Sequence, residues 1–193
     1  MNDVYSPAED TFLLADVLER EQLTGRAVLE IGCGSGYLTK IMEERKANVT
    51  AIDINPAAVE ATKKLLSVEK SSVHIVQSDL FVKVRGKFDL IVFNPPYLPE
   101  GDGDKIAGSD TRYSGGRSGR KTIERFVIDC AAHMSEGGKA LILISSLTGE
   151  RAVCSLFEEN GFAVHVIARK KVPWEELIVI EARCRLSISL GKR

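Results

Sequence analysis

Two consecutive prolines that directly follow an apolar run are the sequence feature that most constrains the fold. The run Phe88–Val92 is typical of a buried strand in a parallel sheet. Neither Pro95 nor Pro96 can donate a hydrogen bond to a sheet ladder, so the strand has to stop there. Asn94 is therefore expected at the carboxyl end of a strand, which is the edge where open α/β sheets bind their ligands.

The turn after this strand is rich in hydrogen-bond acceptors. Each proline holds the preceding residue extended, so the Asn94 side chain and the Pro95 carbonyl are expected to be rigid. A planar NH2 group would donate one hydrogen to each of these oxygens, with Tyr97 against its flat face. Taken alone, the same residues also fit a strand-ending turn whose Asn caps backbone groups. The candidate substrate-binding residues are Asn94, Pro95, Pro96 and Tyr97, and we expect Asn94, Pro95 and Tyr97 to be catalytic.

A second strand, Ala27–Ile31, leads into three glycines spaced two apart, Gly32, Gly34 and Gly36. The sixth position from the first glycine is Tyr37, which excludes a G-x-G-x-x-G dinucleotide fingerprint, and no Gly-Lys-Ser/Thr follows for a Walker loop. With Glu30 before them, the glycines resemble motif I of S-adenosylmethionine-dependent methyltransferases. Glycines allow close approach of the backbone to a cofactor, although an ordinary strand-to-helix turn has the same pattern.

Acidic residues follow two further predicted strands, Val49–Asp53 and Val73–Gln77. A carboxylate at Asp53 would accept hydrogen bonds from both ribose hydroxyls of an adenosine. Asp79 would accept the exocyclic amine of adenine, with Leu80 against the ring. A single Asp after a strand is usually a turn residue. Together with Glu30, however, these carboxylates are predicted to share one edge of the sheet.

Patterning predicts the remaining elements. A capping box at Ser6–Glu9 predicts a helix over Ser6–Glu21, and Asn55 is expected to cap the helix after the second strand. Further strands are predicted at 139–144, 163–168 and 177–185, with a helix from Gly149 to a cap at Asn160-Gly161. Residues 98–119 are long for a loop and rich in Gly, Asp and Arg, so we expect them to be mobile and functional, or else a solvated insertion.

Size and charge limit the classes of function. The 193 residues fit one domain, and no linker divides them. Twenty-six Lys and Arg against 27 Asp and Glu give a net charge of −1, which argues against binding of nucleic acid by bulk electrostatics and leaves only a local basic patch open. The first residues lack the character of a signal peptide and no run is long enough to span a membrane, so a cytoplasmic protein is expected.

The four cysteines are scattered along the chain. They are Cys33, Cys130, Cys154 and Cys184, with no pair at CxxC spacing. This pattern indicates reduced thiols and predicts neither a disulfide framework nor a zinc site. No metal is expected.

Together the motifs resemble the HemK-like glutamine methyltransferases that modify class I translation release factors. The match runs through the glycine turn, the two acidic strand ends and the Asn94–Tyr97 turn, and it spans nearly the whole chain. The stretches Tyr5–Leu14 and Gly115–Arg120 resemble the short archaeal and eukaryotic branch. The resemblance implies a Rossmann-like, seven-stranded, mostly parallel sheet with an antiparallel last strand and helices on both faces. It also implies a single methyltransferase domain over 1–193, with a helical segment at 1–25 near the cofactor and a substrate loop at 94–119.

The resemblance also implies ligands and partners. Methyl transfer from S-adenosylmethionine to N5 of the glutamine in the release factor's Gly-Gly-Gln motif is expected. A small zinc-ribbon activator is expected to pair with the exposed edge of the third strand, where Ile75 is apolar and Phe81 and Val82 follow soon after. The chain's own loops or a homodimer are the alternative ways to cover this edge. The residues implied to bind the cofactor are Thr11, Glu30, Gly32, Gly34, Gly36, Asp53, Asp79, Leu80 and Asn94.

Other functions are compatible with the same residues. The Asn94–Tyr97 motif is shared with adenine-N6 methyltransferases of nucleic acids, and it fixes the chemistry better than the substrate. Near-neutral charge and the lack of a separate recognition domain argue against nucleic acid. Lysine methylation is a further alternative. A noncatalytic cofactor-binding protein would be expected to lose the motif, which is intact here.

Overall fold

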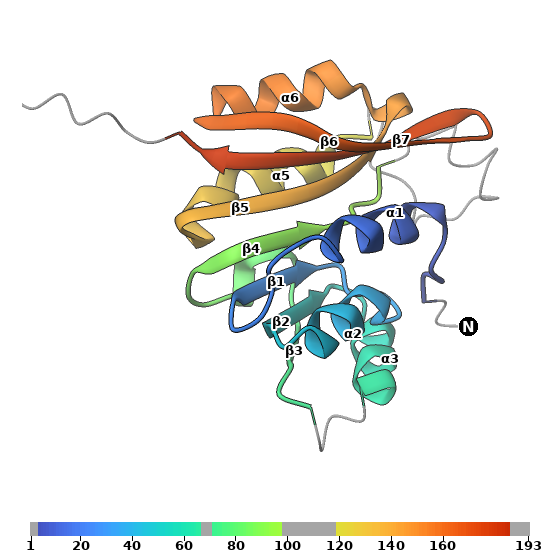
Figure 1. Cartoon of the computed structure of the whole chain (residues 1–193), viewed down its shortest axis with the longest axis vertical. Helices are drawn as coiled ribbons and strands as arrows, with labels where there is room; N and C mark the ends of the chain where they lie inside the picture. Colours follow the sequence, from blue (N-terminus) through green and yellow to red (C-terminus); the bar gives the residue numbers. More distant parts are fainter. Residues whose placement is uncertain (1–3, 67–70, 98–118, 186–193) are drawn as a thin grey trace, which may run out of the picture.

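The computed structural model describes residues 4–66, 71–97 and 119–185, which form one seven-stranded sheet in the order β3-β2-β1-β4-β5-β7-β6 (Figure 1). Strands β1 to β5 run parallel to one another, and β7 runs antiparallel to both β5 and β6. This confirms the predicted fold. The strands are β1 Ala27–Ile31, β2 Asn48–Asp53, β3 His74–Gln77, β4 Phe88–Phe93, β5 Met134–Ser145, β6 Phe162–Val172 and β7 Glu175–Cys184.

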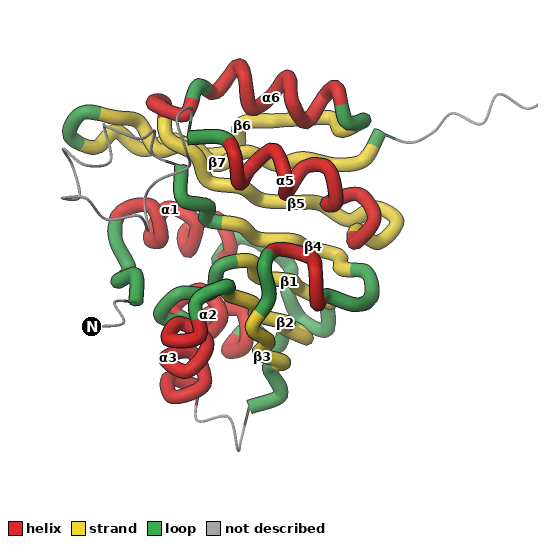
Figure 2. The backbone as a smooth tube through the Cα atoms, turned by 180° about the vertical axis from the view of Figure 1, so that it is seen from behind, coloured by secondary structure: helices red, strands yellow, loops and turns green. Residues whose placement is uncertain are grey.

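Helices cover both faces of the sheet (Figures 1 and 2). One face carries α1 Glu9–Leu18, α2 Tyr37–Glu44 and α3 Pro56–Leu66, and the other carries α5 Lys121–Cys130 and α6 Glu150–Glu159. Short 3₁₀ turns are η1 Leu80–Lys83, η3 Ala131–His133 and η4 Ser146–Thr148. In the described ranges, no helix combines the length and the apolar character that crossing a membrane requires.

The central strand β4 shows why the sheet is buried on both sides. Leu90 and Val92 point toward the α1–α2 face, whereas Ile91 and Phe93 point toward the α5–α6 face, and all four are at most 3% exposed. Successive strand residues alternate between faces, so an unbroken apolar run serves two cores. On the second face, Phe126 of α5 lies 4.9 Å from the Phe93 ring. The carboxyl end of β4 is thus held between two packed layers.

The N-terminal helix begins later than predicted. Helix α1 starts at Glu9 with Ala8 as its N-cap, and no side chain caps it, so the predicted capping box at Ser6 and the range Ser6–Glu21 are wrong. The preceding segment is extended and ties itself to the helix instead, because the Tyr5 hydroxyl donates to Asp10 Oδ1 at 2.6 Å. This contact directs Tyr5 toward the glycine turn, where a Cβ at Gly34 would lie 3.8 Å from the Tyr5 carbonyl oxygen.

Two other differences concern elements after β3. Residues 121–130, for which no element was predicted, form α5. The amphipathic spacing of Ile123, Phe126, Val127 and Cys130, all buried, is the signal for this helix. Phe81, grouped above with the exposed third strand, is instead 5% exposed and stacks on Phe126. The predicted loop over 98–119 lies outside the described residues except for Gly119, so its role stays a prediction.

Glu30 is the most unusual polar residue of the sheet. It lies on β1, is 2% exposed, and accepts a hydrogen bond from the Thr39 hydroxyl of α2. Burial raises the pKa of Glu30 to about 8, although the Thr39 hydrogen bond opposes the shift, and the nearby Asp53 charge adds to it. At neutral pH this side chain is therefore mostly a neutral acid, and its contact with Thr39 joins β1 to α2.

Replacement of Glu30 tests this protonation. Because the folded pKa of about 8 exceeds the ordinary value of 4.5 for a glutamate, the stabilising contribution is complete below pH 4.5 and is lost as pH rises toward 8. The free energy of unfolding of the ligand-free protein should fall across that window. Glu30→Gln, an isostere of the neutral acid, should remove the fall, as measured by denaturant unfolding at several pH values. The exposed Glu19→Gln should keep it, and parallel pH profiles for Glu30→Gln and the unaltered protein would contradict the assignment.

Candidate active site

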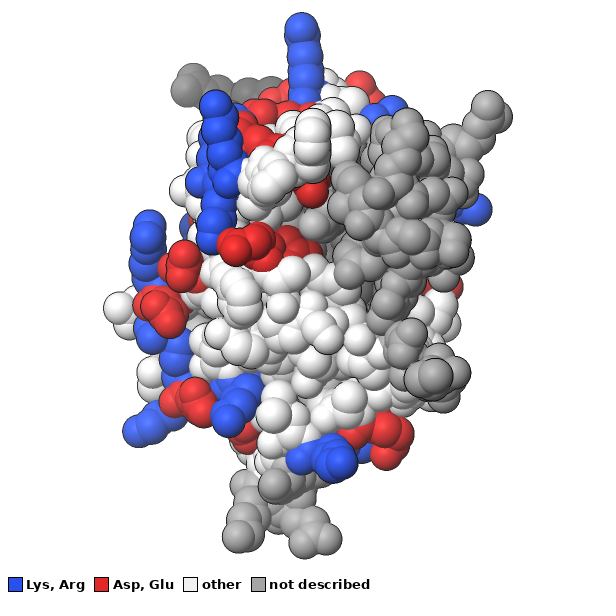
Figure 3. All heavy atoms as spheres, turned by 90° about the vertical axis from the view of Figure 1, so that its right-hand side faces the viewer, with Lys and Arg blue, Asp and Glu red and all other residues white. Residues whose placement is uncertain are grey.

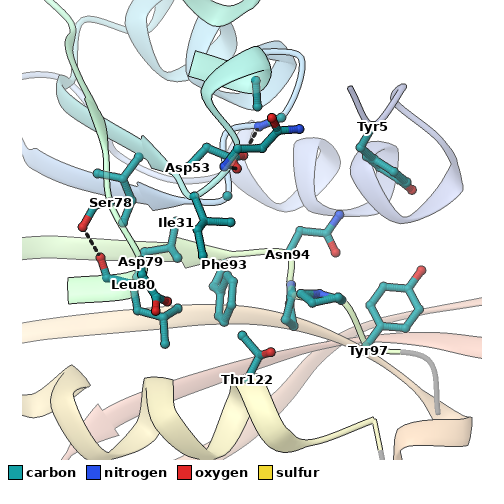
Figure 4. A pocket seen from close by; sticks show the side chains of 18 of the residues that line it. Tyr5, Ile31, Asp53, Ser78, Asp79, Leu80, Phe93, Asn94, Tyr97 and Thr122 are labelled. Atoms are coloured by element: carbon teal, nitrogen blue, oxygen red, sulfur yellow. Dashed lines mark hydrogen bonds between the residues drawn. The ribbon is translucent and has the colours of Figure 1, made fainter. Parts of the chain in front are cut away.

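The carboxyl ends of the parallel strands surround a cavity of about 330 Å³, a size typical of small-molecule sites (Figure 4). Its walls come from β1, β2, β4, the turn after β3, the N-terminal segment and α5. In Figure 4 the predicted residues spread along it, with Asp79 and Leu80 at one end and Asn94 and Tyr97 at the other. Asp53 lies between them. The strand-end residues that the sequence placed far apart are thus brought to one site.

Asp53 at the end of β2 links the glycine turn to α3. Its Oδ2 accepts the Gly34 backbone N–H at 2.9 Å and its Oδ1 accepts the Asn55 N–H at 2.8 Å. Asn55 in turn caps α3 as predicted, because its Oδ1 accepts the Ala57 N–H at 2.9 Å. Burial raises the pKa of Asp53 against the effect of these backbone hydrogen bonds. Each carboxylate oxygen keeps a further lone pair, so the pair can still accept two hydroxyl groups from a ligand.

Asp79 and Leu80 form the opposite end of the cavity. Asp79 Oδ2 accepts a hydrogen bond from Arg125 Nη2 of α5 at 2.8 Å, which leaves Oδ1 for another donor. Leu80 is 8% exposed and has φ of 45°, a conformation that costs a branched side chain energy. Ser78 stabilises the turn, since its hydroxyl donates to the Leu80 carbonyl at 2.9 Å. The turn therefore places an apolar side chain beside a carboxylate.

Asn94 occupies the third strand end with one polar atom unused. Its Nδ2 donates to Asp10 Oδ2 at 3.0 Å, whereas its Oδ1 is buried and has no hydrogen-bond partner. A buried acceptor without a partner is costly and usually marks a site where a ligand supplies the donor. Tyr97 is held beside it, because its hydroxyl donates to Asp10 Oδ2 at 3.3 Å and its carbonyl accepts the Thr148 hydroxyl at 2.9 Å. Burial raises the pKa of Tyr97, so the phenol stays protonated.

Three predicted cofactor residues do not line the cavity. Thr11 donates its backbone N–H to Asp10 Oδ1 at 2.6 Å, and Glu30 is enclosed below the turn. Gly36 begins α2 with φ of 83°, and a Cβ there would lie 3.0 Å from the Thr62 side chain. A side chain at this position would clash with α3. These three residues lie behind the residues that line the cavity. Direct contact of any of them with the cofactor stays a prediction.

Several lining residues were missed by the sequence analysis. Tyr5 and Asp10 line the cavity from the N-terminal segment, and Thr122 and Arg125 line it from α5. Asp10 carries a weak sequence signal as an acidic residue in the first turn of a helix, a place that also suits the helix dipole. Nothing in the sequence connects α5 with the strand ends. Helix packing, not local pattern, brings Arg125 to Asp79.

The charges of the lining residues select the kind of ligand that fits. Carboxylates at Asp10, Asp53 and Asp79 face the cavity. Of its described lining residues, Arg125 alone is Lys or Arg, and its guanidinium is paired with Asp79. Phosphate groups would be repelled here, whereas hydroxyls, amines and cationic groups would find acceptors. S-Adenosylmethionine, with its ribose hydroxyls, adenine amine, ammonium and sulfonium, fits this set.

Comparison with known proteins also indicates a methyltransferase. Residues 4–110 match the family model of the methyltransferase small domain. A putative protein N5-glutamine methyltransferase of Methanocaldococcus jannaschii is 40% identical over 182 residues, which cover 93% of this chain and 91% of that protein. A ribosomal RNA small subunit methyltransferase C of Haemophilus influenzae is 30% identical over 148 residues, covering 74% of this chain and 40% of that protein.

A solved structure agrees over the whole fold. The E. cuniculi Mtq2–Trm112 complex, described as responsible for methylation of the eRF1 translation termination factor, aligns with a TM-score of 0.78 and 28% identity over 96% of this chain and 100% of the matched chain. With the family model matched over more than half of the chain and a relative matched over most of both lengths, the chain belongs to the methyltransferase small domain family, as a HemK-like S-adenosylmethionine-dependent protein N5-glutamine methyltransferase.

Proposed function

We propose that this enzyme methylates N5 of the glutamine in the Gly-Gly-Gln motif of a class I translation release factor. The observation that carries the proposal is the buried, unpartnered Asn94 Oδ1 on the wall of a cavity suited to the cofactor. A primary amide is a planar NH2 donor, and its nitrogen would satisfy this acceptor. The similarity to glutamine methyltransferases, one of which is described as acting on eRF1, supports the choice of substrate.

The surface around the site favours a protein substrate over nucleic acid. Figure 3 looks onto the edge at which β4 and its parallel neighbours end, and the described atoms there form a broad uncharged area with Lys, Arg, Asp and Glu mostly around its margin. A nucleic-acid substrate needs basic side chains along the path of its phosphates. The net charge of −1 does not supply them in bulk. Adenine-N6 methylation is thus the weaker alternative, despite the similarity to a ribosomal RNA enzyme.

The proposed cofactor contacts follow from the acceptors described above. Asp53 would hold the ribose hydroxyls, while Asp79 and Leu80 would hold the adenine. Gly32 and Gly34 would lie under the methionine part, and the N-terminal segment 1–25 would contribute through Tyr5. When bound, S-adenosylmethionine supplies an electrophilic methyl group on its sulfonium.

Asn94 and the Pro95 carbonyl would position the glutamine amide for attack. The amide nitrogen is a poor nucleophile because its lone pair is delocalised into the carbonyl. It gains positive charge as the N–CH3 bond forms, so its N–H hydrogen bond to Asn94 Oδ1 becomes stronger in the transition state than in the ground state. The methylated nitrogen then loses its proton to water, and no general base is required. Tyr97, held by Asp10 and Thr148, would close the flat face of the amide.

Locating the transferred methyl group tests the proposal. The purified chain is incubated with methyl-labelled S-adenosylmethionine and, in separate reactions, with release factor, DNA and RNA, and the product is mapped by mass spectrometry. Label on the Gly-Gly-Gln glutamine is expected. Label on a nucleic-acid amine, or on lysine alone, would overturn the proposal in favour of one of the alternatives.

Asp53→Ala is expected to weaken S-adenosylmethionine binding tenfold or more. The substitution removes an acceptor shared by two hydroxyls, and a hydrogen bond to a charged group contributes about 1.5–3 kcal/mol. Titration calorimetry measures the loss, and the melting temperature separates it from disruption of the Gly34 and Asn55 contacts. Glu60→Ala, at an exposed carboxylate of α3, is the matched control. Unchanged affinity in Asp53→Ala would remove the ribose assignment.

Asn94→Ala is expected to keep cofactor affinity and lose turnover. If each hydrogen bond to the amide deepens by about 1–2 kcal/mol in the transition state, the loss of one lowers kcat roughly 5- to 30-fold, and lost orientation lowers it further. Steady-state kinetics with release factor measure the change. Asn48→Ala, at an exposed end of β2, should behave like the unaltered enzyme. Near-normal turnover in Asn94→Ala would mean that another group holds the amide.

The edge of the sheet at β3 suits the proposed zinc-ribbon activator. Strand β3 pairs only with β2 in the described chain, so its outer backbone groups are open for an added strand. Ile75 is half-buried, and Val82 in η1 is 67% exposed, whereas Phe81 packs inward and offers no surface. The E. cuniculi relative was solved as a complex with Trm112, which supports a heterodimer of the same kind.

Charge placed at this edge should prevent activation. Co-expression with the activator is expected to raise solubility and activity, and Ile75→Glu should abolish the gain. Val82→Glu should do the same, and because Val82 is exposed this variant separates loss of the partner from loss of folding. Ile167→Glu on β6, at the opposite edge, is the control. If the chain alone is monomeric, soluble and fully active on release factor, the activator proposal fails.

A further inference from the structure

We propose that Asp10 is a positioning residue that fixes the Asn94 amide with its oxygen, and not its nitrogen, free to meet the substrate. The inference deepens the proposed function and rests on it for the identity of the substrate. The contact between Asp10 and Asn94, by contrast, involves only residues of this chain and does not depend on which substrate binds. A side-chain amide has a donor end and an acceptor end of nearly the same shape, so an Asn can hold an NH2 group only when something decides which end faces the substrate.

The hydrogen bonds of the Asp10 carboxylate fit this positioning role. Asp10 is 4% exposed, and within the described chain its carboxylate accepts hydrogen bonds from donors on Tyr5, Thr11, Asn94 and Tyr97. The Tyr5 hydroxyl and the Thr11 backbone N–H each lie 2.6 Å from Oδ1, and the Thr11 hydroxyl lies 3.3 Å from it. Oδ2 accepts from Asn94 Nδ2 at 3.0 Å and from the Tyr97 hydroxyl at 3.3 Å. One oxygen is thus anchored to the N-terminal segment and the other to the residues of the reaction site.

The carboxylate leaves Asn94 only one favourable orientation. A carboxylate can only accept, so turning the amide over would set Asn94 Oδ1 against Asp10 Oδ2 at about hydrogen-bond distance, with two acceptors facing each other. The observed orientation has a different cost, the burial of Asn94 Oδ1 without a hydrogen-bond partner. That cost is recovered only when a ligand brings an N–H donor. The orientation therefore makes the site selective for NH2 groups over carbonyl or ether oxygens.

The same contact strengthens the acceptor. A negative charge beside Nδ2 polarises the Asn94 amide and increases the electron density on Oδ1. The substrate nitrogen becomes positive during methyl transfer, so a polarised Oδ1 stabilises the transition state more than the ground state. Glu175, whose pKa is raised by burial and also by the Asp10 charge, is a second carboxyl near this group. Asp10 therefore acts through Asn94 and need not touch the substrate.

The first test observes the Asn94 amide directly and needs no substrate. In the NMR spectrum of the full chain, the Asn94 side-chain NH2 signals, identified by their loss in Asn94→Ala, should show slow hydrogen exchange. Asp10→Asn, which keeps the shape of the side chain, should shift them and speed their exchange. Asp16→Asn, on the exposed side of the same helix, should leave them unchanged. Fast exchange in the unaltered protein, or unchanged signals in Asp10→Asn, overturns the inference.

The second test is kinetic and uses a rescue. Asp10→Asn should lower kcat about tenfold or more with little change in the KM for cofactor, and it should lower kcat no further in an Asn94→Ala background. Asn94→Asp should be less active still, because two carboxylates then oppose each other. The double variant Asp10→Asn/Asn94→Asp restores a donor facing an acceptor and again leaves one oxygen free. It should be at least about tenfold more active than Asn94→Asp.

The outcomes separate this inference from the proposed function. If the unaltered enzyme leaves release factor unmodified while the NMR signals depend on Asp10, the substrate assignment fails and the positioning role stands. In that case the kinetic cycle is run on the substrate that does accept the label. If Asp10→Asn instead loses cofactor affinity in calorimetry, with additive effects in the Asn94→Ala background and no rescue in the double variant, Asp10 binds cofactor directly and the inference is wrong.

Discussion

The forced end of β4 is the constraint on which the site depends. Because Pro95 and Pro96 cannot continue the ladder, the backbone leaves the sheet while Phe93 is still buried between two helical layers. The turn is then held from both sides. The Asn94 carbonyl oxygen lies against Gly32, where a Cβ would come within 3.8 Å, and the Thr148 hydroxyl donates to the Tyr97 carbonyl. The pairing of β4 with its neighbours and the Thr148 contact therefore hold the turn that carries Asn94.

A concentration of carboxyl groups is the electrostatic consequence of bringing strand ends together. Glu30 is buried and Asp53 half-buried, and desolvation raises the pKa of each, so ionising these carboxyl groups costs free energy. The Cys33 thiol between them is pushed further from ionisation by its burial and by the same two carboxyl groups. A cationic ligand reverses this situation, since it stabilises the ionised carboxylates. Binding free energy and pH-dependent stability are thus linked through one set of groups.

The sequence predicts this fold well where a local pattern has one physical meaning. The apolar run before the prolines, the glycine spacing and the acidic strand ends all led to the correct sheet and to Asp53, Asp79 and Asn94 on one cavity. It failed where long-range packing decides. Arg125 reaches Asp79 only because α5 packs on η1. A short-range contact was also missed, since Tyr5 binds Asp10 and no side chain caps α1. The resemblance pointed to Thr11, while the neighbouring Asp10 lines the cavity.

Specificity has to arise beyond the acceptor that Asn94 presents. A glutamine amide, an adenine amine and a lysine amine all offer N–H donors, so Oδ1 alone cannot distinguish them. Their shapes and charges differ: adenine needs room for a ring and its phosphates need cations, whereas the described margin of the cavity pairs its single guanidinium with Asp79. A glutamine amide is smaller than adenine and carries no phosphate, and the Tyr97 hydroxyl beside it is already bound to Asp10. Under the proposed function, the lack of an unpaired Lys or Arg on the described cavity wall would disfavour a substrate that carries phosphates.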